Sequence, residues 1–177
     1  MILVVAATHR ELAGADGAAV LACGIGPVEA AAATARALAE RSPTGVLQVG
    51  IAGARGLDVP QLVIGSEAVY EDAAGGALVP DRVYADAQLL DRARRALPEA
   101  RVLPIGTSAR VGGTTGCTVE AMEGFAVLRA AELAGIPALE VRAVSNEIDE
   151  PDRARWRFDD ALAALDEALP RLLAALR

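Results

Sequence analysis

The chain has 177 residues, a formal net charge of −7 and 53% hydrophobic residues. This length suits a single domain with its own core, and the negative charge argues against a nucleic-acid partner, whose binding surface would be basic. No apolar run approaches the ~18 residues that span a bilayer, so we expect no membrane partner. His9 is the only histidine, which argues against a Ser-His-Asp triad and against a histidine-rich metal site.

The start of the chain and its two cysteines indicate a cytoplasmic protein. After Met1 the sequence continues I-L-V-V-A-A, without the basic start that is typical of a signal peptide. Cys23 and Cys117 lie far apart and match no zinc-binding spacing. We interpret both as reduced, buried cysteines and expect no metal.

The first half of the chain alternates between apolar runs and turn-forming segments. Apolar runs predict strands at residues 2–6, 18–23, 46–49 and 62–70. An alanine-rich helix is predicted at 28–40, because Pro27 suits the first helical position. Gly24 and Gly26 match the start of a dinucleotide-binding fingerprint, but Glu29 stands where the third glycine belongs. We therefore expect no nucleotide cofactor.

Residues 50–54, G-I-A-G-A, follow the third predicted strand, and we interpret them as a glycine-rich turn. In a structural interpretation, the small residues let a helix pack closely. In a functional interpretation, they let a flat base or sugar lie against the backbone. Ile51, Ala52 and Gly53 would then bind the substrate.

The second half continues the alternation. Helices are predicted at 86–97, 122–133 and 158–176, with Pro170 expected to kink the last one. Strands are predicted at 101–106 and 138–144, a loop or short hairpin at 75–81, and irregular segments at 107–118 and 147–157. The segment 107–118 is either a plain solvent loop or a loop that holds a base, in which case Val111 would contact the substrate.

This alternation of strands and helices predicts an α/β fold. We expect residues 1–177 to form a single-domain three-layer α/β/α sandwich. The central β-sheet should be mixed, because some connections are too short for a helical crossover.

Glu123 and Arg142 are charged residues within apolar runs. A charge in such a place costs free energy unless it is paired or has a function. Glu123 could lie on a solvated helix face while Arg142 pairs with Glu140 or Glu123. Alternatively, both could belong to a functional site, and the residue pattern alone leaves the two interpretations open.

Three motifs carry a resemblance to a known family. They are Met-Glu-Gly-x-Ala from Met122, Gly-Ile-Pro from Gly135, and Val-Arg-Ala-Val-Ser-Asn ending at Asn146. Together they resemble the C-terminal signature of the nucleoside phosphorylase and nucleosidase superfamily, and within it the purine nucleosidases, most of all futalosine hydrolases. The resemblance implies a small-molecule purine nucleoside as substrate, no cofactor, and assembly into a homodimer or larger homo-oligomer.

Hydrolysis of a ribose–purine bond passes through an oxocarbenium-like sugar. The resemblance implies that Glu11, after the first strand, acts as general base on water. Glu123 would accept hydrogen bonds from the ribose hydroxyls, with Met122 packed beneath the sugar. Arg142 would orient Glu123 or the water, and the Asn146 amide would donate to the departing purine.

The asparagine distinguishes this chain from nucleosidases that act on methylthioadenosine, whose signature ends in Ser-Asp. The Asn146 amide cannot protonate adenine, but it suits a 6-oxopurine. The resemblance therefore favours release of hypoxanthine from futalosine on a route to menaquinone. A methylthioadenosine/adenosylhomocysteine nucleosidase and a non-catalytic nucleoside-binding α/β protein are the alternatives.

Two further interpretations concern cations. Arg10 is the only cation near the end of the first strand other than the neighbouring histidine, so water is favoured over phosphate as the nucleophile. His9, Arg10 and Arg110 are interpreted as solvated loop residues, or alternatively as contacts for a carboxylate on the 5′ extension of the substrate.

Overall fold

The computed structural model describes residues 1–73, 75–114 and 116–177. Thr115, which belongs to the predicted irregular segment 107–118, lies outside this range. The strands are β1 (Ile2–Ala6), β2 (Ala19–Ala22), β3 (Gly45–Ala54), β4 (Leu62–Tyr70), β5 (Arg82–Tyr84), β6 (Arg101–Thr107), β7 (Val119–Ala121) and β8 (Ala138–Glu147). The α-helices are α1 (Pro27–Arg41), α2 (Ala87–Ala96), α3 (Gly124–Leu133) and α4 (Phe158–Leu176).

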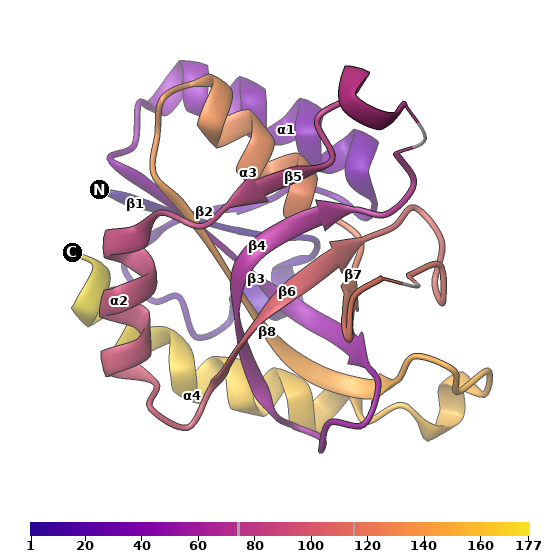
Figure 1. The fold of residues 1–177 in the computed structure, drawn as a ribbon. Coiled ribbons are helices and arrows are strands. Elements are labelled where there is room, and N and C mark those ends of the chain that lie inside the picture. Colours follow the sequence, from indigo (N-terminus) through magenta and orange to yellow (C-terminus); the bar gives the residue numbers. More distant parts are fainter. Residues whose placement is uncertain (74, 115) are drawn as a thin grey trace.

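The strands form one mixed sheet in the order β2-β1-β3-β7-β6-β4-β5, and β8 pairs with both β3 and β4. Strands β1, β3 and β8 run parallel, whereas β7 is antiparallel to β3 and β8 is antiparallel to β4. Because β8 joins β3 to β4, the strands β3, β8, β4, β6 and β7 close into a ring (Figure 1). The predicted mixed sheet is confirmed.

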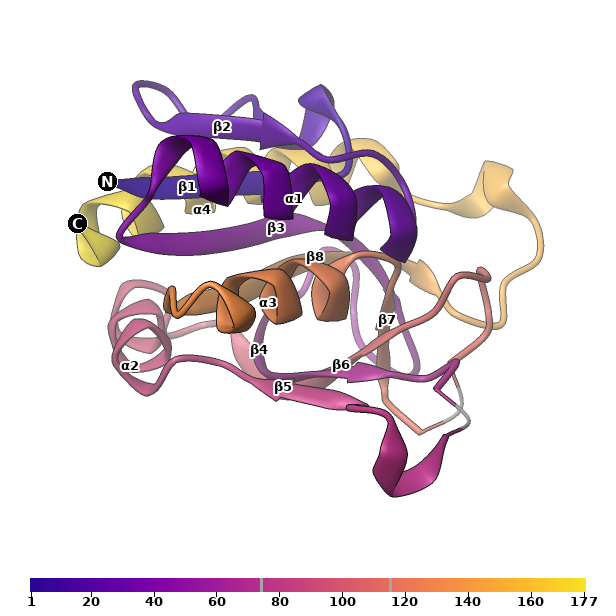
Figure 2. The same cartoon turned by 90° about the horizontal axis from the view of Figure 1, so that it is seen from above.

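Helices cover both sides of this sheet. Helices α1 and α3 pack together on one side, and α2 and α4 lie against the other (Figures 1 and 2). Strand β1 contributes side chains to the hydrophobic cores on both faces of the sheet, because successive side chains of a strand point to opposite faces. Leu3 and Val5 pack with α1 and α3, while Ile2 and Val4 pack with α2 and α4. This arrangement confirms the predicted α/β/α sandwich and explains why the first strand is apolar throughout.

The closed ring has its own small interior. Its side chains come from five strands and are Ala52, Ala54, Val63, Ile105, Val119, Ala121 and Val144. In β7 the outer residues Val119 and Ala121 point inward, so Glu120 between them must point out of the ring. This alternation determines which side chain of β7 reaches the functional site described below.

Several predicted boundaries are confirmed. Strands β1 and β4 and helix α4 have the predicted limits, and α1 begins with Pro27 at its first position. Helix α3 ends before Gly135, whose φ of 68° lies in the left-handed region where glycine is favoured. Helix α4 continues through Pro170.

The interpretation of residues 50–54 as a turn is wrong, because β3 continues through them to Ala54. Strand β8 pairs with β3 along this whole stretch, and the backbone of Gly50 and Gly53 stays extended. The predicted helix at 122–133 also starts too early, because Met122 and Glu123 precede α3. Strands β5 and β7, three residues each, have no counterpart in the predicted elements.

The predicted burial of the two cysteines is only half correct. Cys23 is buried as predicted, whereas Cys117 is partly exposed; both are free thiols. Burial is the main reason that the pKa of Cys23 is raised to about 12. None of the helices in the described ranges combines the length and apolarity required to cross a membrane.

Candidate active site

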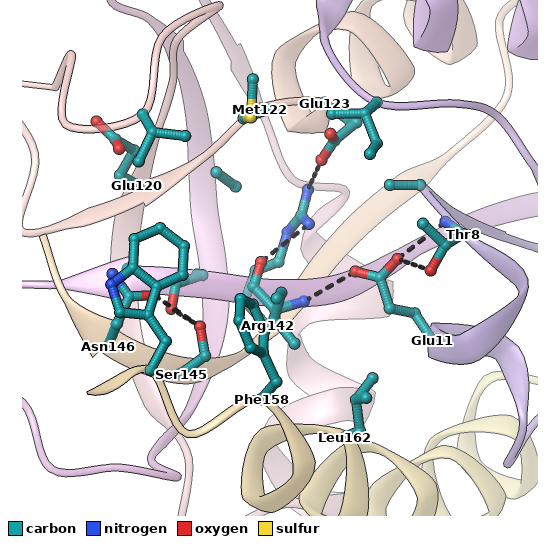
Figure 3. A pocket seen from close by; sticks show the side chains of 18 of the residues that line it. Thr8, Glu11, Glu120, Met122, Glu123, Arg142, Ser145, Asn146, Phe158 and Leu162 are labelled. Atoms are coloured by element: carbon teal, nitrogen blue, oxygen red, sulfur yellow. Dashed lines mark hydrogen bonds and ion pairs between the residues drawn. The ribbon is translucent and has the colours of Figure 1, made fainter. Parts of the chain in front are cut away.

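A cavity of about 390 Å³ opens at the carboxyl ends of the parallel strands β1, β3 and β8 (Figure 3). Ligands of open α/β sheets bind at this edge. All of the site residues predicted from sequence line it: Glu11, Ile51, Ala52, Gly53, Val111, Met122, Glu123, Arg142 and Asn146. The cavity thus brings together residues from distant parts of the chain, although their chemical roles remain predictions.

Glu11 lies in a short 3-10 helix, His9–Leu12, directly after β1. Its Oε2 accepts hydrogen bonds from the backbone N–H of Thr8 at 2.9 Å and from the Thr8 hydroxyl at 2.8 Å. Its Oε1 accepts from the backbone N–H of Ile51 at 3.2 Å. With only 6% of its surface exposed, the carboxylate is held in one orientation beside the cavity.

Glu123 is the residue immediately before α3 and is 4% exposed. Its Oε1 accepts from the backbone N–H of Gly26 at 3.1 Å, and its Oε2 accepts from Arg142 Nη2 at 3.3 Å. The interpretation that Glu123 lies on a solvated helix face is therefore wrong. The predicted pairing of Arg142 with glutamate is confirmed, because Arg142 Nε also donates to Glu140 Oε1 at 2.8 Å.

The guanidinium of Arg142 is the centre of a buried network and is 1% exposed. Besides both glutamates, it donates through Nη1 to the Ile51 carbonyl at 3.3 Å. When the Gln48 amide is oriented by its neighbours, its oxygen accepts from Nη2 at 3.2 Å. A buried charge is tolerated when it is paired and hydrogen-bonded in this way. Burial lowers the pKa of Arg142, but Glu140 and Glu123 together raise it above its ordinary value.

Glu140 differs from the other carboxylates because it is fully buried and its Oε2 has no hydrogen-bond partner among the described residues. Burial raises the pKa of this carboxyl above 4.5, and the opposing effect of Arg142 is smaller. Arg142 donates to only one of the two carboxylate oxygens of Glu140, so the negative charge of the ionised form is only partly compensated. Glu140 lies behind Arg142 and does not line the cavity.

Two glycines make room for this network. A Cβ atom at Gly50 would lie 2.5 Å from Arg142 Nη1 and 2.7 Å from Glu11 Oε1. A Cβ atom at Gly124 would collide with the carboxylate of Glu140. The glycines therefore allow β3 and the start of α3 to approach the buried charges. Their small size is needed for this packing, and neither glycine forms a turn.

Asn146 sits near the end of β8, after a register shift that places it beside Gly53 of β3. Its Oδ1 accepts from the Ser145 hydroxyl at 2.7 Å, and its Nδ2 donates to the Glu147 carbonyl at 2.9 Å. These contacts fix the orientation of the amide. Because an amide nitrogen carries two hydrogens, one N–H remains for a ligand.

The predicted side chains occupy different ends of the cavity. In Figure 3, Glu11 and Thr8 lie at one end, Asn146 lies at the other, and Arg142 with Glu123 lies between them. A sugar between the two ends could therefore face a carboxylate on one side and an amide on the other. This order matches the separation of nucleophile and leaving group that glycoside hydrolysis requires.

Sequence reasoning assigned no role to several residues of the cavity wall, among them Glu120, Arg153, Trp156 and Phe158. The ring centroids of Trp156 and Phe158 are 5.5 Å apart, and Arg153 Cζ lies 5.5 Å from the Trp156 centroid. The single tryptophan, which stands in a charged irregular segment, could have indicated this aromatic wall. Glu120 gave no signal, because its position depends on the pairing of β7.

Of the cations considered for a substrate carboxylate, Arg10 lines the cavity but pairs with Asp159 at 3.1 Å. His9 and Arg110 are exposed and are absent from the cavity lining. Within the ranges that the structure describes, no group of three or more His, Cys, Asp and Glu side chains could hold a metal ion.

Comparisons with known proteins extend over nearly the whole chain. A family model described as the phosphorylase superfamily matches residues 6–177. Futalosine hydrolase of Streptomyces coelicolor is 35% identical over 189 residues, which cover 91% of this chain and 80% of that protein.

Solved structures share the fold. A futalosine hydrolase mutant of Helicobacter pylori has a TM-score of 0.88 and 16% identity, with 98% of each chain covered. A Streptococcus pneumoniae MTA/SAH nucleosidase in complex with 8-aminoadenine has a TM-score of 0.87 and 21% identity, with 98% of this chain and 99% of that chain covered.

Proposed function

The chain belongs to the phosphorylase superfamily and is a nucleosidase, an N-glycosyl hydrolase, and on that premise we propose that it hydrolyses futalosine to hypoxanthine and dehypoxanthine futalosine. The observation that carries this proposal is the buried amide of Asn146, which keeps one N–H available at one end of the cavity. The 35% identity to futalosine hydrolase of Streptomyces coelicolor supports the same substrate.

Each step of hydrolysis has a candidate group in this arrangement. Glu11 takes a proton from water as the water attacks the anomeric carbon, a role typically worth ~10²–10⁴-fold in rate. Glu123 accepts hydrogen bonds from the ribose hydroxyls and keeps the sugar in the reactive geometry. Because both groups are carboxylates, they also favour the positive charge that develops on the sugar.

The leaving base explains the preference for hypoxanthine. As the glycosidic bond breaks, negative charge moves onto the purine, and a donor placed there stabilises it. The Asn146 amide donates to the imidazole nitrogen or to the 6-oxo group, but it supplies no proton to an adenine. Hypoxanthine departs as its anion and is protonated by solvent, to which Glu11 returns the proton that it took from water, so no acid is needed at this position.

The proposal is tested by incubating the protein with futalosine, inosine and methylthioadenosine, with and without phosphate, and identifying the products by chromatography. We expect hypoxanthine from futalosine at a rate that phosphate does not change. Preferential release of adenine from methylthioadenosine would replace this substrate assignment with the alternative one. A phosphorylated sugar product would contradict hydrolysis.

We also propose that the chain forms a homodimer or a larger homo-oligomer. Ile25 and Val28 are 63% and 78% exposed, and Val111 at the cavity is 45% exposed. Exposed apolar side chains of this size are typical of surfaces that become buried in an assembly. Light scattering coupled to gel filtration should give at least twice the 18.1 kDa of one chain. A monomeric mass at micromolar concentration would contradict self-association.

A further inference from the structure

Glu140 shares the guanidinium of Arg142 with Glu123. Arg142 Nε donates to Glu140 Oε1 at 2.8 Å, and Arg142 Nη2 donates to Glu123 Oε2 at 3.3 Å. Glu123 and Arg142 line the cavity, whereas Glu140 lies behind them and is fully buried. The reaction proposed above gives Glu140 no role. Because a buried carboxylate is costly unless it is paired or has a function, its position behind Arg142 calls for a function.

The two contacts divide one edge of the guanidinium. The Nε–H and one N–H of Nη2 lie side by side, and arginine typically uses such a pair to bind both oxygens of a single carboxylate. In this protein the pair is split, because Nε donates to Glu140 and Nη2 donates to Glu123. The remaining nitrogen, Nη1, donates to the Ile51 carbonyl at 3.3 Å. Glu123 thus receives a single N–H from Arg142.

This division leaves part of the Glu123 carboxylate available to a ligand. A carboxylate has about four acceptor sites. The Gly26 N–H occupies one of them at 3.1 Å, and Arg142 Nη2 occupies a second. About two sites therefore remain, which matches the two hydroxyl groups of a ribose. A bidentate pair with Arg142 would occupy a third site and draw the carboxylate toward the guanidinium.

The start of α3 provides the space for the Glu140 carboxylate. A Cβ atom at Gly124 would lie 2.2 Å from Glu140 Oε2 and 2.3 Å from Oε1. Gly124 is the first residue of α3 and directly follows Glu123. The carboxylate thus packs against the backbone next to Glu123, at the end of a helix where a negative charge is favoured. Any larger residue at position 124 would displace it from Arg142.

We propose that Glu140 is a positioning residue, which keeps Arg142 from pairing bidentately with Glu123 so that Glu123 retains acceptor sites for the ribose hydroxyls. This inference rests on the proposed nucleosidase function, in which Glu123 binds the sugar, and extends it to the selection of ribose over 2′-deoxyribose. Without Glu140, the Nε–H would lose its acceptor in a buried site, which is costly. Pairing with the second oxygen of Glu123 would satisfy it at the expense of the sugar.

A purely structural role of Glu140 predicts a different outcome. A loss of stability lowers activity on all substrates alike, whereas a displaced Glu123 weakens the contacts to the ribose hydroxyls. The measurement is therefore the ratio of kcat/KM for futalosine to that for 2′-deoxyfutalosine, which lacks only the 2′ hydroxyl. Leu169→Ala is the structural control, because Leu169 is fully buried in the core on the opposite face of the sheet and its truncation destabilises the fold.

Glu140→Leu should lower this ratio by ~10-fold or more relative to the parent, as expected for loss of a hydrogen bond to a charged group. Glu140→Gln should keep the ratio within about twofold, because the amide oxygen still accepts from Nε. Leu169→Ala should leave the ratio unchanged even where it lowers both rates. An unchanged ratio in Glu140→Leu, or an equal fall in Glu140→Gln, would overturn the inference. A parent protein that is inactive on both nucleosides would instead refute the proposed function.

A second measurement does not depend on the substrate. In a crystal structure of Glu140→Leu without ligand, we expect Arg142 to donate to Glu123 through both Nε and Nη2, at roughly 2.7–2.9 Å. An Arg142 side chain that keeps its present single contact with Glu123 would contradict the inference. If Glu140→Leu does not fold, Gly124→Ala takes its place, because its added Cβ displaces the Glu140 carboxylate. The same bidentate pair and a lower ratio are expected there.

Discussion

The floor of the cavity and its rim are built on different physical principles. On the floor, Glu11, Glu123 and Arg142 are at most 6% exposed, and each has at least two hydrogen-bond partners within the protein. At the rim, Arg10 pairs with Asp159 although their side chains are 71% and 95% exposed. The floor is fixed before any substrate arrives, whereas the rim pair is open to solvent.

From this difference we propose that the floor of the cavity performs the reaction. Charges in a water-excluded site interact strongly and need little reorganisation during catalysis. Ion pairs in solvent are screened and contribute little to stability. We therefore expect changes on the floor to affect catalysis or stability strongly, and changes to the rim pair to affect both weakly. The following variants test that contrast, from the largest expected effect to the smallest.

Glu11→Gln should cause the greatest loss of activity. It removes the proton acceptor but keeps the size of the side chain, so kcat should fall by ~10²–10⁴-fold. The unfolding midpoint should change little, because a glutamine oxygen still accepts from the Thr8 or Ile51 N–H. Steady-state kinetics of hypoxanthine release measure the loss. A variant that keeps more than a tenth of the parent kcat would exclude Glu11 as the general base.

Glu140→Leu should cause the greatest loss of stability. The change leaves Arg142 buried without its 2.8 Å partner, and breaking a buried ion pair typically costs about 3–5 kcal/mol. Urea unfolding followed by circular dichroism measures the difference. The matched control is Glu99→Leu, which removes a half-exposed partner of Arg171 and should cost much less. Equal losses in the two variants would mean that burial does not strengthen the floor pairs.

Gly50→Ala should disturb the floor through a single methyl group. The added Cβ would meet both Arg142 Nη1 and Glu11 Oε1, and overpacking of this kind costs about 1–3 kcal/mol. Activity should fall together with stability, because both displaced groups face the cavity. Thermal unfolding and kcat are measured on the same preparation. If neither changes, the close approach of β3 to the charges is not needed.

The pH dependence of stability should carry a signature of Glu140. Because burial raises its pKa above 4.5 in the folded protein, the folded state holds this proton more tightly than the unfolded chain does. Its stabilising contribution is complete below 4.5 and is lost as the pH rises through the folded pKa. The stability of the parent relative to Glu140→Gln should thus decline as the pH rises above 4.5. Urea unfolding across this range tests it, and a constant difference would contradict the raised pKa.

Asp159→Asn should have the smallest effect. It removes the exposed partner of Arg10, a pair that contributes less than about 1 kcal/mol. Stability and kcat should stay close to those of the parent, and any change should disappear at high salt because exposed charges are screened. A large loss of stability or kcat that persists at high salt would contradict the proposed difference between the rim and the floor.

Local sequence patterns predicted the long elements well. Residues 2–6, 62–70 and 158–176 are continuous or periodic runs with clear stops, so their limits agree with β1, β4 and α4. Strands β5 and β7 could not be predicted, because three residues carry no periodicity and exist only through pairing with β4, β3 and β6. Strands β5 and β7 are therefore determined by pairing with distant strands and not by the conformational preference of their own residues.

In the candidate site, too, local sequence patterns revealed some residues, whereas others could be recognised only from the pairing of distant strands. Glu123 and Arg142 stood out because charges in apolar runs need partners, and both line the cavity. Gly50 was misinterpreted because glycine usually signals a turn, whereas here it makes room for a guanidinium from β8. Glu120 was missed because nothing in its neighbours reveals that β7 pairs with β3. Contacts between distant strands are not visible in a local pattern.

The most direct test of the central claim is a crystal structure of the Glu11→Gln variant with intact futalosine. The account predicts that Glu123 contacts the ribose hydroxyls, that Asn146 contacts the base, and that residue 11 faces the opposite side of the sugar. A nucleoside bound with its ribose away from Glu123, or in a different cavity, would contradict it.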